Sequence, residues 1–186
     1  MSAQIDSKWP AWFALTVKPR HEKTVEKQLR ILGLDPFLPL YRSRRSWSDR
    51  SKTLDLCLFP GYVFCHFGYE SRLRVLNQAS VTSIVGFGKE PAPVPEREIE
   101  SIRRLLASGR ALSPWPYLRA GQQVRINRGA LEGVSGTLLR ERDEYRVVVS
   151  IELLQRSVAV EIDREMLSRL TREAPRSGLV SAAAYA

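Results

Sequence analysis

Several features that mark common protein classes are scarce or missing in this sequence of 186 residues. Two cysteines, Cys57 and Cys65, are too few for a disulfide scaffold or a four-ligand zinc site. No run approaches the roughly 18 uninterrupted apolar residues that a membrane span needs. The start also lacks a basic segment followed by an apolar core, so we read no signal peptide. We therefore expect a cytoplasmic protein that does not engage a membrane.

Catalytic groups are equally scarce. Only His21 and His66 could act as bases near neutral pH, and no glycine-rich phosphate loop precedes a helix pattern. The acidic residues are scattered singly or sit on predicted helices beside basic residues. Because no nucleophile, base and orienting group occur together, the sequence predicts no enzymatic activity and neither a metal nor a cofactor.

Positive charge is what the sequence has in excess. The net charge is +9, and residues 1–119 hold 19 Lys or Arg against 11 Asp or Glu. Residues 120–186 are nearly balanced, with 10 against 9. A basic surface on one part of the chain indicates a polyanionic partner such as nucleic acid. The alternative is an ordinary solvated cationic surface.

The first 108 residues combine strand and helix patterns. Strands are predicted at 12–17, 54–59, 61–67 and 81–87, and amphipathic helices at 22–32, 70–78 and 96–107. The last helix has an apolar stripe of Ile99, Ile102, Leu105 and Leu106. We predict an α+β domain at 1–108, an α/β sandwich with an antiparallel sheet.

The remaining residues change to a β pattern. Residues 109–119 carry little periodicity and two prolines, which predicts an extended, semi-rigid linker. Four short β runs follow at 123–126, 134–139, 145–153 and 157–162. Such runs suit a small barrel, predicted at 120–172, that closes its own sheet edges. Residues 173–186 have too little apolar mass to fold and are expected to be disordered.

Basic residues gather at two places. Lys18, Arg20, His21 and Lys23 lie where the first strand ends and a helix begins, and the backbone N–H groups there favour phosphates. The second group lies in residues 42–52, predicted as a hairpin tip or a mobile loop, and comprises Arg42, Arg44, Arg45, Arg50 and Lys52 with Trp47. Guanidinium groups bind phosphate, and an exposed indole can stack on an unpaired base. Alternatively, the loop is solvated and Trp47 folds back onto its own domain.

The most specific motif is Phe59-Pro-Gly-Tyr-Val-Phe64. Its Pro-Gly pair predicts a bend next to a strand, and aromatic residues beside a kinked edge can form a patch for a partner helix. From composition alone, a role in the core is equally possible.

Together with Trp12-Phe-Ala-Leu15, this motif resembles the N-terminal domain of NusG-like transcription factors. The run from Gly121 to Leu138 resembles the KOW motif that follows this domain in the same family. Both motifs occur in the family's order over about residues 9–170. The resemblance implies an NGN-like domain, a linker and an SH3-like KOW barrel in a monomeric protein.

In NusG-like proteins, the N-terminal domain docks on the clamp helices of the largest RNA polymerase subunit and suppresses pausing. The resemblance therefore implies a docking patch of Trp12, Phe59, Pro60 and Tyr62, with basic residues facing the non-template DNA strand. The family's KOW barrel recruits a small-subunit ribosomal protein, Rho or nascent RNA. Here the resemblance implies Leu153, Leu154 and Arg156 as anchors for such a partner.

Two departures from the general family pattern stand out. General members commonly have Phe-Gly-Arg where this chain has Glu152-Leu-Leu-Gln-Arg156, and residues 42–52 are unusually basic. Both features resemble specialised antitermination paralogues of the RfaH, UpxY and LoaP kind. The alternative function is a ribosome-associated RNA-binding KOW protein. In some relatives the C-terminal domain covers the docking patch, and the sequence leaves that arrangement open here.

Overall fold

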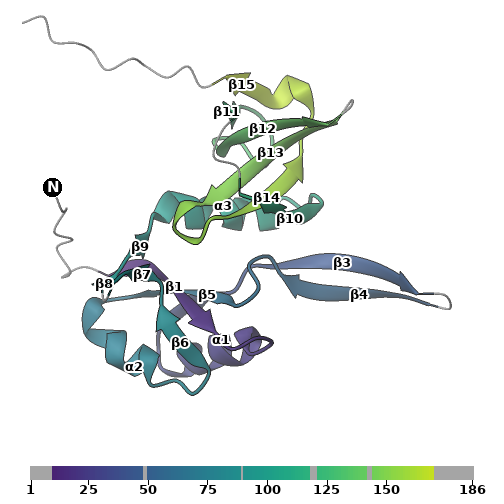
Figure 1. Ribbon diagram of the computed structural model, residues 1–186. Coiled ribbons are helices and arrows are strands. Elements are labelled where there is room, and N and C mark those ends of the chain that lie inside the picture. The colour runs from purple at the N-terminus through teal and green to yellow at the C-terminus, as the bar shows by residue number, and fades with distance from the viewer. Residues whose placement is uncertain (1–9, 48–49, 89, 118–120, 142–143, 170–186) are drawn as a thin grey trace, which may run out of the picture.

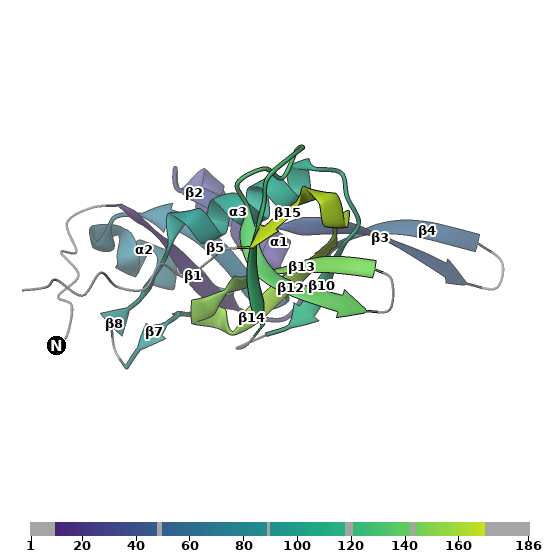
Figure 2. The ribbon, with the colours of Figure 1, turned by 90° about the horizontal axis from the view of Figure 1, so that it is seen from above.

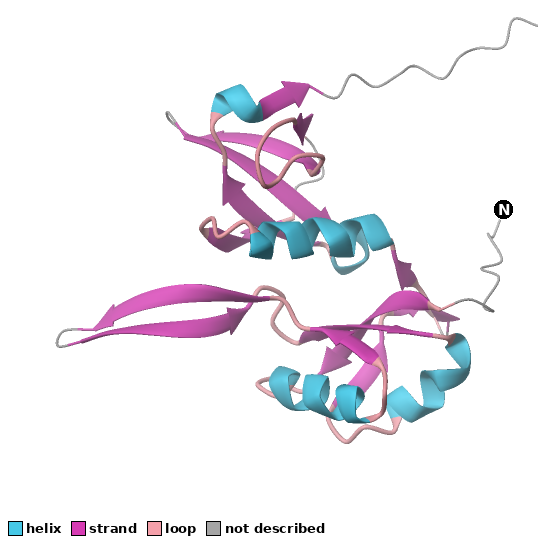
Figure 3. Cartoon of the chain, turned by 180° about the vertical axis from the view of Figure 1, so that it is seen from behind, coloured by secondary structure: helices cyan, strands magenta, loops and turns pink. Residues whose placement is uncertain are grey.

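The computed structural model describes residues 10–47, 50–88, 90–117, 121–141 and 144–169. Three layers are stacked: an N-terminal sheet with two helices on its outer face, then helix α3 (Glu96–Ala107), then a C-terminal barrel (Figure 1). From behind, α3 again lies between the sheet and the barrel (Figure 3). The predicted α+β fold with antiparallel sheets is confirmed.

The N-terminal sheet is built around β1 (Ala11–Val17), whose residues are almost all buried. It pairs in antiparallel fashion with β5 (Tyr62–Phe67) along one edge, and with β6 (Val81–Ile84) and β9 (Pro93–Val94) along the other. β2 (Asp35–Phe37) completes the sheet beyond β5. Because successive side chains of a strand point to opposite faces, this sheet has two apolar faces to cover.

Two helices cover the outer face. The helix α1 (Glu22–Ile31) repeats Val25 and Leu29 four residues apart, which places both on one side of the helix, and both are fully buried. The short α2 (Arg72–Leu76), after a 3₁₀ turn at Tyr69–Ser71, adds Val75. These residues form a core cluster with the outer-facing residues of the sheet, which are Phe13, Leu15, Val17, Val63, Cys65 and Phe67.

The inner face of the sheet meets α3. Ile99, Ile102 and Leu105 recur three residues apart and have no exposed surface. They belong to one cluster with Trp12 and Phe64 of the sheet and with the apolar interior of the barrel. Among the described residues, no helix combines the length and apolarity needed to cross a lipid bilayer.

The barrel is a sheet of short antiparallel strands, in the order β10-β14-β13-β12-β11-β15. The strands are β10 (Leu112–Pro116), β11 (Gln122–Ile126), β12 (Ser135–Glu141), β13 (Glu144–Ile151), β14 (Arg156–Glu161) and β15 (Leu167–Arg169). A 3₁₀ turn at Glu152–Leu154 joins β13 to β14, and another at Arg164–Met166 precedes β15. The alternating valines of β13 and β14 fill the interior.

Two ribbons project from these layers. The hairpin β3 (Leu40–Trp47) and β4 (Arg50–Cys57) extends well beyond the rest of the molecule, as the view from above shows (Figure 2). A smaller ribbon, β7 (Gly86–Phe87) and β8 (Glu90–Pro91), lies at the opposite end (Figure 2).

Two connecting segments differ from the sequence-based expectation. Residues 42–52, expected as a hairpin tip or a mobile loop, lie within the paired strands β3 and β4, apart from 48–49, which fall outside the described residues. Within 109–119, expected to be an extended, semi-rigid linker between the domains, Leu112–Pro116 form the strand β10 of the barrel sheet. Proline is tolerated in an edge strand when its missing N–H would point to solvent. The expected tail at 173–186 lies outside the described residues.

Candidate functional site

The first predicted basic group sits on a tight turn after β1. The N–H of His21 donates to the carbonyl of Lys18 at 3.1 Å, and Arg20 has a φ of +66°. Positive φ is uncommon outside glycine, because the β-carbon crowds the backbone there. Ser80 fixes the turn: its carbonyl accepts from the N–H of Lys18 at 2.9 Å, and its hydroxyl lies 2.9 Å from Nδ1 of His21. All four predicted basic residues, Lys18, Arg20, His21 and Lys23, are exposed.

A buried carboxylate joins this turn to the Pro60-Gly61 bend. Glu22, at the start of α1, is 7% exposed, and its Oε1 accepts a hydrogen bond from the N–H of Gly61 at 2.9 Å. The carbonyl of Gly61 in turn accepts from the N–H of Val17 at 2.9 Å. Gly61 has a φ of +83°, which only glycine adopts without strain. These hydrogen bonds therefore hold the Phe59–Phe64 motif beside the basic turn.

The basic turn also contacts the β3–β4 hairpin. Nζ of Lys23 donates to the carbonyl of Asp55 at 3.4 Å, and Asp55 is the register partner of the exposed Arg42. Further out, the Cα register pairs Arg44 with Thr53, Arg45 with Lys52 and Trp47 with Arg50. The first basic group thus touches the base of the hairpin whose strands carry the second. We call the two groups together the basic edge (Lys18–Lys23 and Arg42–Lys52).

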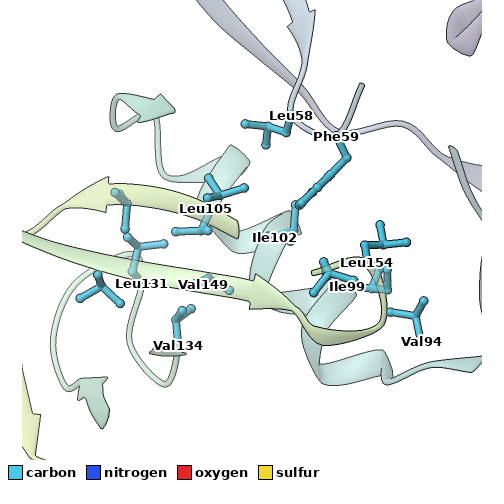
Figure 4. Packing of buried hydrophobic residues seen from close by; sticks show 14 of the residues in the cluster. Leu58, Phe59, Val94, Ile99, Ile102, Leu105, Leu131, Val134, Val149 and Leu154 are labelled. Atoms are coloured by element: carbon cyan, nitrogen blue, oxygen red, sulfur yellow. The ribbon is translucent and has the colours of Figure 1, made fainter. Parts of the chain in front are cut away.

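The aromatic residues predicted to form an exposed docking patch are mostly covered. Trp12 and Phe59 are 4% and 1% exposed, whereas Tyr62 is half-buried and Pro60 is exposed. Phe59 packs edge-on against Phe64, with ring centroids 5.6 Å apart. Figure 4 shows Phe59 pointing toward Ile102 of α3. We call this region, formed by Trp12, Phe59, Tyr62, Ile99 and Ile102, the apolar face.

A cation lies over the indole ring of Trp12. The guanidinium of Arg103 lies 4.8 Å from the Trp12 ring and 5.1 Å from the Phe37 ring. Arg103 also reaches Asp35, at 4.0 Å between Nη2 and Oδ2. This arrangement holds α3 on the inner face of the sheet. Sequence reasoning missed Arg103, because an arginine on a helix flank gives no signal of the ring that it covers.

The β13–β14 turn of the barrel packs against α3 at Ile99, one residue of the apolar face. Leu154 is 7% exposed and lies beside Ile99 and Val94 (Figure 4), and Leu153 packs against the same cluster. Arg156 is exposed. Two of the three residues predicted to bind a separate partner are therefore used inside the chain. They belong to the same apolar cluster as Trp12 and Phe59, which were predicted to bind polymerase.

Polar contacts flank this contact between the domains. The N–H of Glu152 donates to Oε2 of Glu98 at 3.3 Å, and Nη1 of Arg104 donates to the carbonyl of Glu132 at 3.0 Å. Burial raises the pKa of the Glu98 carboxyl, and the hydrogen bond from Glu152 offsets part of that rise. Sequence reasoning missed Glu98 because it sits among the charged residues of an ordinary amphipathic helix.

A polar cavity of about 470 Å³ lies between α3 and the barrel. Arg97, Glu98 and Ser101 line it from α3, while Gln123 and Arg125 line it from β11. The interface therefore combines an apolar contact at the β13–β14 turn with a hydrophilic gap beside it. Interfaces of this mixed kind are typical of domains that can separate.

Possible metal ligands and the two thiols are the groups that bear on whether the described residues carry out chemistry. Among these residues, His, Cys, Asp and Glu do not gather in threes at any place that could hold a metal ion. Burial raises the pKa of the Cys65 thiol to about 12, and burial beside Glu22 raises the pKa of Cys57. Both thiols are therefore protonated at neutral pH and are poor nucleophiles.

Comparison with known proteins decides the family. The family model described as "Transcription termination factor nusG" matches residues 10–103, just over half of the chain. The chain belongs to the NusG family. The match contains the Trp12 strand, the basic turn, the hairpin, the Phe59–Phe64 motif and most of α3.

Full-length relatives extend the similarity into the barrel. The Staphylococcus aureus (strain COL) transcription termination/antitermination protein NusG is 25% identical over 185 residues, covering 91% of this chain and 100% of the relative. The protein of the same name from Helicobacter pylori (strain J99) is 23% identical over 167 residues, covering 81% and 93%. The chain is accordingly a NusG-type transcription termination/antitermination factor.

A solved structure shares the two-part fold. It is described as "Domain interaction in Thermotoga maritima NusG" and superposes with a TM-score of 0.53 at 23% identity. The alignment covers 88% of this chain and 98% of that one. At this identity, the likeness concerns the fold alone.

Proposed function

We propose that this NusG-family chain docks on the clamp helices of RNA polymerase through its apolar face and suppresses pausing or termination. The observation that carries the proposal is that Leu154, in a turn of a separate domain, is buried beside Ile99 of α3, in the same apolar cluster as Ile102 and Phe59. Large contiguous apolar surfaces mark interaction sites when they are uncovered. Departure of the barrel would uncover such a surface.

The chemistry of the apolar face suits a pair of helices. Aromatic and branched side chains from a strand, a bend and a helix present ridges and grooves of the kind into which helical side chains pack. Aromatic anchors in a desolvated centre also dominate the energy of many interfaces. We therefore assign the docking role to Phe59 and Tyr62, with Trp12 and α3 as their support.

In this proposal the barrel is a reversible cover. Polymerase competes with Leu153 and Leu154 for the same face, so binding requires the open form of the chain. Release frees these two leucines, with Arg156, to recruit a second partner such as a small-subunit ribosomal protein or Rho. Thermotoga maritima NusG is described by its domain interaction, and we propose that the interaction in this chain serves as such a cover.

The basic edge supplies the contact to nucleic acid. We propose that Lys18, Arg20, His21 and Lys23 face the non-template DNA strand, with the β3–β4 hairpin extending the contact along it. A single strand in a transcription bubble offers phosphates for the cations and unpaired bases for stacking. The exposure of the turn and the reach of the hairpin both support this role.

Binding of the purified full-length chain to the isolated clamp-helix segment of polymerase tests the docking role. We expect Tyr62→Ala to weaken binding by roughly tenfold, the effect of losing an aromatic anchor. Tyr69→Ala is the matched control, since Tyr69 is also half-buried but lies before α2 on the outer face. Equal affinities for the two variants would refute the assigned face.

Opening is tested by Leu154→Glu, which places a charge in the contact with Ile99. We expect tighter apparent binding to the clamp helices, because affinity is reduced by the fraction of chains that are closed. Leu73→Glu, on the outer helix α2 and 62% exposed, is the control. Co-sedimentation of the Leu154→Glu chain with ribosomes but not with polymerase would favour the ribosome-associated function instead.

A further inference from the structure

The segment between the two domains is part of the barrel sheet. β10 pairs along its whole length with β14, from Leu112 opposite Val160 to Pro116 opposite Arg156. This places β10 outermost, on the edge of β14 that would otherwise be open. An open sheet edge is a template for pairing with another chain. Here the chain's own connecting segment occupies that template.

The prolines of β10 close the new edge in turn. Alternate N–H groups of a strand point to opposite sides, so Pro114 and Pro116 fall on the same side. That leaves Ser113 and Trp115 as the residues whose N–H groups can bond to β14. The missing N–H groups of the prolines then face outward, where proline blocks the addition of a further strand.

Side chains at both ends anchor β10 to the barrel. Just before the strand, Arg110 donates to the carbonyl of Glu161 at 3.1 Å and forms an ion pair with Asp163 at 3.6 Å. Near its other end, the guanidinium of Arg146 lies 5.6 Å from the ring centroid of Trp115. Each of these partners belongs to the barrel.

The junction with α3 is short. The helix ends at Ala107, and β10 begins at Leu112, so four residues separate them. Ser108 caps the helix through its hydroxyl, which donates to the carbonyl of Leu105 at 2.6 Å. Gly109 follows with a φ of +68°, a backbone conformation that glycine adopts without strain because it has no β-carbon.

We propose that β10 is a permanent strand of the barrel, and that barrel and β10 open as one body about a hinge at Ser108–Gly109. The edge of β14 stays closed to partner strands in both states. The surface that opening offers to a second partner is therefore the one that faced α3, at Leu153 and Leu154. The opening step rests on the proposed function, whereas the pairing of β10 does not.

The hinge also limits how far the barrel can travel. Four extended residues span at most about 14 Å, from roughly 3.3–3.6 Å per residue. A barrel on so short a tether keeps a high effective concentration near α3. A chain in which β10 peeled away would have a tether several times longer.

Nuclear magnetic resonance of the full-length chain tests the proposal without polymerase. In Leu154→Glu, and in Leu153→Glu as a second variant at a half-exposed position, we expect the Ile99 and Ile102 methyl signals to shift on opening. Amide exchange at Ser113 and Trp115 should remain within about twofold of the unmodified chain. Loss of protection at these two amides on opening, or no methyl shift in either variant, would overturn the proposal.

A cross-link gives an independent check. Pro116 and Arg156 are both exposed and are register partners. Because the missing N–H groups of the prolines face outward, this pair exchanges no backbone hydrogen bonds. In such pairs the Cα atoms approach to about 4.5 Å, a distance that a disulfide can span. In the Leu154→Glu background, oxidised Pro116→Cys/Arg156→Cys should open as fully as its reduced form. Closure on oxidation would show that β10 must leave β14. Polymerase binding enters neither experiment, so failure of the docking function is scored separately.

Discussion

At the interface between α3 and the barrel, Glu98 keeps a carboxyl group almost out of contact with water. It is 8% exposed, and burial raises its pKa. In the open form the same group would be solvated, and burial would no longer raise its pKa. The charge of Arg97 beside it lowers the pKa, while the charge of Glu152 across the interface raises it, so the effect of burial is only partly offset.

The sign of the pH effect follows from this raised pKa. A group whose pKa is higher in the closed form favours closure fully below its ordinary pKa, and this contribution is lost as pH rises through the raised value. We expect the closed fraction to fall over that window. Glu98→Gln should keep the chain closed across it, as measured by the Ile99 methyl signals. An unchanged pH profile in Glu98→Gln would contradict the assignment.

Arg20 shows a conflict between stability and binding at a single residue. Its φ of +66° is unfavourable for any residue with a β-carbon, at a cost of roughly 1 kcal/mol. We expect Arg20→Gly to raise the free energy of unfolding by up to about 1 kcal/mol, and to weaken binding to single-stranded DNA because a phosphate-binding cation is removed. Chemical denaturation and fluorescence anisotropy measure the two effects. Lower stability of Arg20→Gly would refute the strain argument.

At the scale of elements, the periodicity of apolar residues predicted where helices and strands lie. It did not predict which element packs against which. The stripe Ile99, Ile102 and Leu105 predicted the helix at 96–107, and α3 has those bounds. The same stripe does not tell which element covers it, because a helix face has the same apolar pattern whether it packs on a sheet or on a barrel. Leu154 was equally ambiguous: an apolar turn residue suits an external partner or an internal one.

β10 was missed because its sequence argues against a strand. Pro114 and Pro116 suggest a spacer, and only the pairing with β14 shows that both missing N–H groups fall on the outer side. We expect Pro114→Thr/Pro116→Thr to restore N–H groups on the exposed edge and cause edge-to-edge association. Analytical ultracentrifugation should show self-association that rises with concentration. Ser113→Thr, exposed on the same strand, is the control that should stay unassociated.

Across the whole molecule, the two proposed binding surfaces differ in their exposure to solvent in the closed form. The apolar face is buried, with Phe59 only 1% exposed, and Ile99 lies against the barrel turn at Leu154. The basic edge remains open to solvent at Lys18, Arg20 and Lys23, and its hairpin extends beyond the barrel (Figure 2). If both surfaces have the proposed roles, we expect the closed chain to bind nucleic acid before opening allows it to bind polymerase.

This asymmetry predicts that opening separates the two activities. Leu154→Glu should strengthen binding to the clamp helices and leave affinity for single-stranded DNA within about twofold. Lys18→Ala/Lys23→Ala should weaken binding to single-stranded DNA and leave binding to the clamp helices unchanged. This variant should also lower the slope of log DNA affinity against log salt by about 0.7 for each phosphate that it no longer neutralises, the value for single strands. Fluorescence anisotropy at several salt concentrations measures both. A large gain in DNA affinity on opening would mean that the barrel also shields the basic edge, so that one movement controls both surfaces together.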